Sequence, residues 1–122
     1  MSPENANIFV AEDDPRWQEI IKKSVEKGGQ TVTHQAQTRD EAMALVPTLE
    51  ASGVQVAILD GNLSKGISSG DDGRDIAAAI RSQATNIKIV GFSASNTIKG
   101  ADVSLDKTTF EPIDLANSVT GL

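Results

Sequence analysis

The chain contains no cysteine, which excludes disulfide bonds and thiolate chemistry and is typical of a reducing cytoplasm. Lys and Arg form no cluster, and 17 acidic against 11 basic residues give a net charge of −6. Nucleic-acid binding is therefore not expected, because phosphate contacts need clustered basic side chains. No apolar run approaches membrane-spanning length, and residues 1–5 lack the basic start of a signal peptide. We expect a cytoplasmic protein without membrane association.

The chain does have the length and composition of one globular domain. Its 122 residues allow a single hydrophobic core. Hydrophobic residues make up 39% and charged residues 23%, which is ordinary for a folded protein. Because the sequence shows no repeat or linker, residues 1–122 are predicted to form one domain.

Short apolar runs alternate with amphipathic segments along the whole chain. Apolar runs bounded by polar residues are typical of buried parallel strands. The predicted strands are residues 8–11, 31–36, 54–60, 87–92 and 102–105, and the predicted helices are residues 15–27, 38–46, 73–84 and a last helix from Pro112. This alternation of five strands with helices predicts an α/β three-layer sandwich with a parallel sheet.

Local signals mark where the helices begin and end. Asp14 followed by Pro15 is typical of a helix N-cap and first helical position. Thr38 and Glu41 have the spacing of a capping box. Pro47 is expected to kink or loosen the last turn of that second helix. Residues 61–72 are rich in Gly and Ser and are predicted to form a loop.

Acidic residues follow two of the most apolar strands. Asp60 ends the run 54–60, and Glu12 and Asp13 come directly after the run 8–11. In a doubly wound sheet, the carboxyl ends of the central strands form the ligand crevice. Carboxylates from two strands would repel one another there unless a cation lay between them. The sequence therefore predicts a hard divalent metal ion beside a reactive aspartate.

Further characteristic residues stand at the ends of the later strands. Ser93 and Ala94 follow the fourth predicted strand, and the stretch 100–102 precedes Leu105 and Lys107. Together with Glu12, Asp13 and Asp60, this pattern resembles the receiver domain of two-component response regulators, of the single-domain chemotaxis-regulator kind. The resemblance covers nearly the whole chain. It implies a doubly wound, flavodoxin-like sheet of five parallel strands in the order 2-1-3-4-5.

The resemblance also implies a role for each residue of the site. Asp60 corresponds to the phosphoacceptor, and Lys107 and the Ser93 hydroxyl to the groups that bind the transferring oxygens. A Mg²⁺ ion would neutralise part of the charge that opposes attack by a carboxylate on a phosphoryl group. Its implied ligands are the side chains of Asp13 and Asp60, the backbone carbonyl of Asn62 and, through water, Glu12.

Three features depart from the family pattern. Only residues 95–99 separate Ser93 and Ala94 from Gly100, so the fourth helix is expected to be missing or much reduced. Ser104 stands where the family often has an aromatic residue, and Thr108 follows the lysine where proline is usual. The loop after Asp60 is lengthened by all or part of residues 65–70.

The resemblance implies a stand-alone receiver that accepts a phosphoryl group from a histidine kinase or a histidine phosphotransfer protein. We expect a signalling monomer, not an enzyme with a separate substrate, that acts by contact with a downstream protein. One alternative is a degenerate receiver that serves as a phosphorylation-independent adaptor. A third possibility, a Mg²⁺-dependent phosphatase with Asp60 as nucleophile, is disfavoured because Asn62 occupies the place of the required second aspartate.

Overall fold

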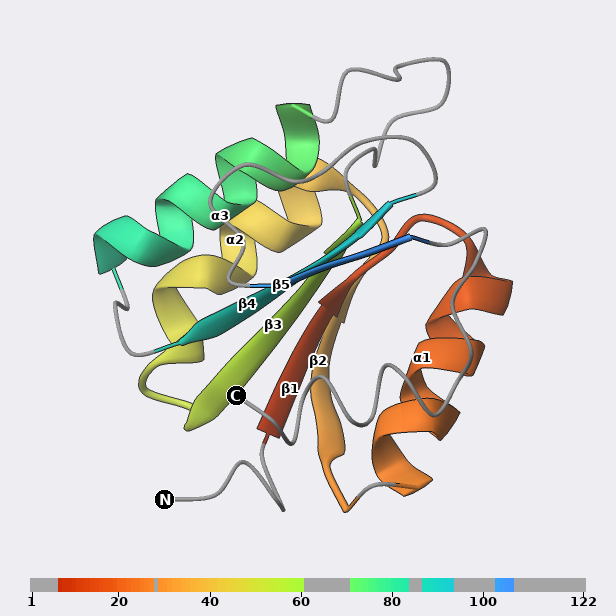
Figure 1. Cartoon of the computed structure of the whole chain (residues 1–122). Coiled ribbons are helices and arrows are strands. Elements are labelled where there is room, and N and C mark those ends of the chain that lie inside the picture. The colour runs from red at the N-terminus through yellow and green to blue at the C-terminus, as the bar shows by residue number, and fades with distance from the viewer. Residues whose placement is uncertain (1–6, 28, 61–70, 84–86, 94–102, 107–122) are drawn as a thin grey trace.

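The computed structural model describes residues 7–27, 29–60, 71–83, 87–93 and 103–106 (Figure 1). The elements follow one another as β1 (Asn7–Ala11), α1 (Pro15–Lys27), β2 (Thr31–Ala36), α2 (Arg39–Leu49), β3 (Val54–Asp60), α3 (Asp71–Gln83), β4 (Lys88–Ser93) and β5 (Val103–Asp106). All strand pairs are parallel, and the sheet has the order β2-β1-β3-β4-β5. The predicted fold class and strand order are therefore confirmed.

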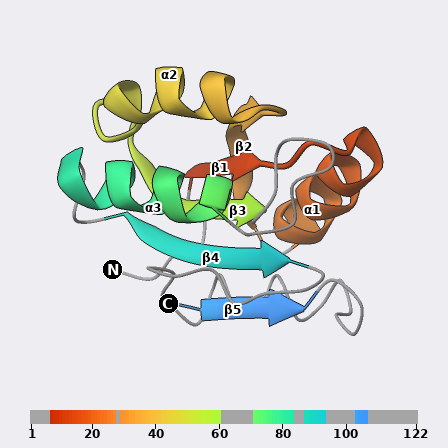
Figure 2. The ribbon, with the colours of Figure 1, turned by 90° about the horizontal axis from the view of Figure 1, so that it is seen from above.

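The helices cover both faces of the sheet, which makes three layers. α1 lies on one face, whereas α2 and α3 lie side by side on the other (Figures 1 and 2). Among the helices that the structure describes, none has the length and apolar character needed to cross a membrane.

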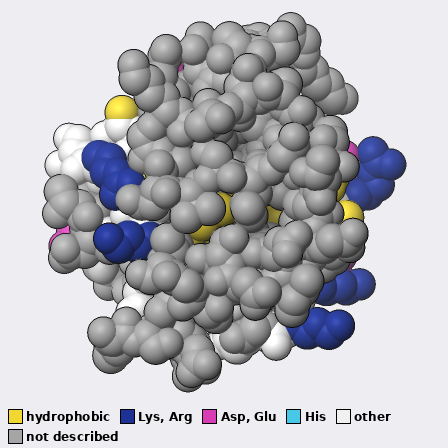
Figure 3. All heavy atoms as spheres, in the orientation of Figure 1, with side chains coloured by type: hydrophobic (Ala, Val, Ile, Leu, Met, Phe, Trp, Pro, Cys, Tyr) yellow, Lys and Arg dark blue, Asp and Glu magenta, His cyan; other side chains and the backbone are white. Residues whose placement is uncertain are grey.

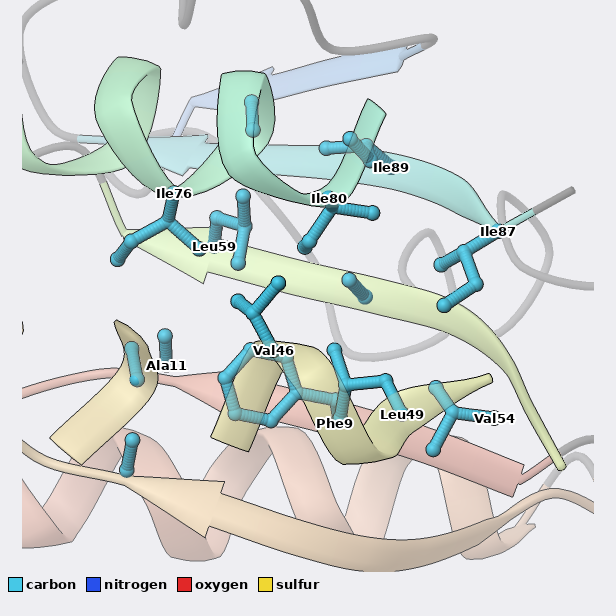
Figure 4. Packing of buried hydrophobic residues seen from close by; sticks show 14 residues of the cluster. Phe9, Ala11, Val46, Leu49, Val54, Leu59, Ile76, Ile80, Ile87 and Ile89 are labelled. Atoms are coloured by element: carbon cyan, nitrogen blue, oxygen red, sulfur yellow. The ribbon is translucent and has the colours of Figure 1, made fainter. Parts of the chain in front are cut away.

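The core consists of two apolar layers, one on each side of the sheet. Successive side chains of a strand point to opposite faces, so Ile8 and Val10 pack toward α1 while Phe9 and Ala11 pack toward α2 and α3. Figure 4 shows how side chains of α2 and α3 meet those of the sheet in the second layer. This two-sided burial explains the continuous apolar runs 8–11 in β1 and 56–59 in β3.

Caps formed by side chains fix where α1 and α2 begin. Asp14 Oδ1 accepts a hydrogen bond from the backbone N–H of Arg16 at 2.8 Å, which confirms the predicted N-cap. Thr38 Oγ1 accepts from the N–H of Glu41 at 3.1 Å, as the capping box requires. The reciprocal bond differs, because Glu41 Oε1 accepts from the N–H of Gln37 at 2.9 Å instead of that of Thr38.

Some predicted boundaries are wrong by one to three residues. α3 begins at Asp71, so residues 71–72 belong to the helix and not to the predicted loop. Acidic residues are favourable in a first helical turn, because the free N–H groups there carry partial positive charge. Pro47 lies inside α2, which ends two residues later at Leu49. The predicted changes to the fourth helix and the last helix from Pro112 fall outside the described residues.

Two consecutive isoleucines of α1 provide a test of the packing. Ile21 is 1% exposed within the layer that faces the sheet, and Ile20 is 38% exposed on the other side of the helix. We expect Ile21→Ala to lower the free energy of unfolding by about 2–5 kcal/mol, through lost burial and a residual cavity. Ile20→Ala is the matched control and should change it by about 0.5 kcal/mol or less. Equal losses in urea denaturation of the two variants would contradict this placement of α1.

Candidate functional site

The register of the sheet brings the chemically important positions to one edge. Ala11 of β1 pairs with Leu59 of β3, so Glu12 and Asp60 each come one residue beyond this pair. Asp60 in turn pairs with Phe92 of β4, which directly precedes Ser93. Because the strands are parallel, all these positions lie at the carboxyl edge of the sheet.

The same register extends to the last strand. Ser93 pairs with Asp106 of β5, the residue before Lys107. The backbone therefore brings the predicted acceptor position and the predicted hydroxyl position to this edge. The predicted lysine, Lys107, is the next residue of the chain after Asp106. The side chains of Asp60 and Ser93, and all of Asn62 and Lys107, lie outside what the structure describes, so their roles remain predictions.

Glu12 is a buried carboxylate at this edge. Its side chain is 0% exposed, and Oε2 accepts a hydrogen bond from the backbone N–H of Asp14 at 3.2 Å. The backbone N–H of Glu12 donates to the carbonyl of Ala36 at 3.0 Å, which extends the β1–β2 pairing by one bond. An ionised carboxylate is costly to bury unless donors or a cation compensate it. This position is therefore suited to support a bound cation.

The three consecutive acidic residues differ in their surroundings. Asp13 is half-buried beside the buried Glu12. Asp14 turns to the helix, where its carboxylate caps α1 and also accepts from the guanidinium of Arg16 at 3.1 Å. This hydrogen bond and the negative charge of Asp14 raise the pKa of Arg16. The structure thus supports the interpretation of Asp14 as a helix cap and leaves Glu12 and Asp13 as the acidic pair.

A buried glutamine that the sequence analysis did not identify lies next to this pair. Gln18 of α1 is 6% exposed, and its Nε2 donates to the carbonyl of Glu12 at 3.0 Å and to that of Ala36 at 2.9 Å. Its Oε1 accepts from Gln35 Nε2 at 3.1 Å. A signal was present, because Gln18 shares helical spacing with Ile21 and Val25 on the buried side of α1.

The donor types at the edge fit a hard divalent cation. Carboxylate oxygens are the ligands that Mg²⁺ prefers in proteins, and two successive residues with carboxylates, Glu12 and Asp13, follow β1. Within the part of the chain that the structure describes, no three His, Cys, Asp or Glu side chains form a metal-binding group. The predicted ligand set needs Asp60 and Asn62 as well, so it stays a prediction.

Trp17 and His34 occupy structural positions. Trp17 is half-buried against the apolar layer between α1 and the sheet. His34 is half-buried on the edge strand β2, where its Nδ1 lies 2.9 Å from Thr33 Oγ1.

Comparison with known proteins identifies the family. The family model of the response regulator receiver domain matches residues 8–113. No curated protein sequence matches the chain significantly.

Solved structures of receiver domains share the fold. One is the signal receiver domain of the response regulator NarL from Mycobacterium tuberculosis, with 25% identity, a TM-score of 0.76 and coverage of 96% of this chain and 94% of that one. A second is the CheY-like receiver domain protein from Methanospirillum hungatei, at 19% identity, TM-score 0.76 and coverage of 95% and 91%. A third, the response regulator PhyR from Brucella abortus, is 26% identical with a TM-score of 0.71, and the match covers 93% of this chain and 46% of that one. The chain belongs to the response regulator receiver domain family.

Proposed function

We propose that this protein is a receiver that accepts a phosphoryl group on Asp60. The donor is a histidine kinase or a histidine phosphotransfer protein, and the protein signals in the cytoplasm by contact with a downstream protein. One observation carries the proposal: parallel pairing brings the ends of β1, β3 and β4, and with them Glu12, Asp60 and Ser93, to a single edge. β5 ends at the same edge, directly before Lys107.

The chemistry follows from the residue types at this edge. A carboxylate oxygen of Asp60 attacks the phosphorus of a phosphohistidine, the P–N bond breaks, and an aspartyl phosphate forms. Both reactants are anionic, so the edge must hold positive charge in place for them to meet. Ser93 and Lys107 bind the phosphoryl oxygens, mainly by positioning and electrostatic stabilisation.

Magnesium is the proposed cofactor. Asp13, Asp60 and the carbonyl of Asn62 would hold the ion directly, and the buried Glu12 would hold it through water. When bound, the ion neutralises part of the negative charge on the acidic residues and the phosphoryl group. Burial of Glu12 and the half-burial of Asp13 support this assignment.

The exposed side of α1 offers a surface for the phosphodonor. A hollow of about 490 Å³ is lined, among the described residues, by Ile20, Lys23, Ser24, Glu26 and Lys27. α1 begins at Pro15, two residues after Asp13, and the hollow lies along its later turns, so a partner that binds along this helix toward its first turn reaches the site. Figure 3 shows the described Lys and Arg side chains at both margins of the face it draws instead of in one patch. Because the basic side chains are not gathered in one patch, we expect a protein partner at this surface.

A second candidate function is a phosphorylation-independent adaptor. Ser104 favours it, because this β5 residue pairs with Gly91 at a place where the family often has an aromatic side chain that responds to phosphorylation. The two functions differ in one measurable property, which is whether Asp60 becomes phosphorylated.

The acceptor assignment predicts the outcome of a labelling experiment. With Mg²⁺ and a small phosphodonor such as acetyl phosphate, intact-mass spectrometry should show addition of one phosphate to the protein. Asp60→Asn should abolish this addition, because an amide cannot form the acyl phosphate. Asp14→Asn is the matched control and should be labelled like the unchanged protein. Undiminished labelling of Asp60→Asn would contradict the assignment of Asp60 as the acceptor. Absence of labelling in every variant and in the unchanged protein would favour the adaptor function.

The metal assignment predicts which carboxylate controls Mg²⁺ binding. Addition of Mg²⁺ should raise the thermal midpoint of the unchanged protein, because the site exists only in the folded state. Asp13→Ala should lose this increase. Asp14→Asn removes the same charge one residue away and retains a good N-cap, so it should keep most of the increase. An equal Mg²⁺ response in Asp13→Ala and in the unchanged protein is the result that rules the ligand set out.

A further inference from the structure

We propose that Gln18 is a positioning residue for the acidic pair: its side-chain amide fixes the peptide between Glu12 and Asp13 in the orientation that metal binding requires. The inference rests on the proposed function, since it concerns the same Mg²⁺ site. It assigns a task to a side chain of α1 that carries no charge and is not one of the proposed ligands.

The Gln18 side chain lies where β1 and β2 end. The β1–β2 pairing closes with Ala11 opposite Ala36, and one more bond joins the N–H of Glu12 to the carbonyl of Ala36. Beyond this point, the chain leaves the sheet to enter α1. The carbonyl of Glu12 therefore cannot continue the ladder, and it receives the Nε2 hydrogen bond of Gln18 at 3.0 Å instead.

The same amide nitrogen also donates to the carbonyl of Ala36 at 2.9 Å. Its two hydrogens thus join the ends of β1 and β2, at a position where the side chain is 6% exposed. The orientation of the amide is determined, because Oε1 accepts from Gln35 Nε2 at 3.1 Å and a flipped amide would place oxygen against two carbonyls. An apolar side chain of similar length would fill the space and leave both carbonyls without these bonds.

The consequence for the site follows from covalent geometry. The carbonyl of Glu12 belongs to the planar peptide that ends at the Cα of Asp13. Holding this carbonyl fixes the plane and, with it, the N–Cα bond of Asp13, which leaves fewer rotations by which the Asp13 carboxylate can move. Mg²⁺ demands nearly ideal octahedral geometry, so a small rotation of one carboxylate weakens binding. Groups that orient ligands from outside a metal's coordination sphere typically control affinity by about 10–100-fold.

Gln18→Met tests the inference, because methionine keeps the length of the side chain and removes both donors. Gln35→Met is the matched control: Gln35 is exposed, and its loss leaves both bonds from Gln18 to the backbone possible. Isothermal titration calorimetry with Mg²⁺ alone should give a dissociation constant about tenfold weaker for Gln18→Met. The constant for Gln35→Met should match that of the unchanged protein.

The outcomes separate this inference from the proposed function. If the unchanged protein binds Mg²⁺ and Gln18→Met binds it equally well, the positioning role is wrong while the proposed function stands. A lower thermal midpoint with an unchanged dissociation constant would show a purely structural role and would also overturn the inference. If the unchanged protein binds no Mg²⁺, the proposed metal site itself fails. Gln18→Asn, whose shorter amide cannot reach both carbonyls, replaces the methionine variant if that variant does not fold. If neither variant folds in saturating Mg²⁺, Gln18 is required for folding and the positioning role is overturned.

Discussion

The parallel pairing of β1 with β2 on one side and β3 on the other is the constraint on which the site depends. It places the end of β1 between two other strand ends, so the backbone of the acidic residues after Ala11 and the backbone of Asp60 lie at the same edge. Carboxylates that share one site repel one another. Carboxylates at this edge therefore need hydrogen-bond donors or a cation to compensate their charge. The proposed Mg²⁺ ion would provide this compensation.

Three consecutive carboxylates of one chemical kind are given different tasks by their surroundings. Glu12 is fully buried and accepts a backbone N–H, Asp13 is half-buried, and Asp14 caps α1 and pairs with Arg16. Gln18 completes the arrangement from α1 by holding the backbone at the point where β1 ends. The local geometry of the acidic pair thus depends on a helix, two strand ends and a cap that form together.

The sequence predicted most of this architecture because the patterns involved are local. Uninterrupted apolar runs identified the buried strands, and Asp14 and Thr38 marked two helix starts that the structure confirms. The start of α3 was predicted two residues late, since Gly-rich loop composition outweighed the favourable effect of Asp71 at a helix N-terminus. Gln18 was missed because its role depends on Ala36, a residue 18 positions away that only the folded sheet brings near. The roles of Asp60, Asn62, Ser93 and Lys107 still rest on the family pattern and on backbone register.

The central claim is that Asp13 and Asp60, from two different strands, share one metal ion. Crystals grown with Mn²⁺ test it directly, because this ion accepts the same oxygen ligands as Mg²⁺ and its anomalous scattering locates it without assumptions. The account predicts one Mn²⁺ coordinated directly by side-chain oxygens of both residues at the carboxyl edge. An Mn²⁺ bound by one of these carboxylates without the other, or crystals with no Mn²⁺ at this edge, would contradict it.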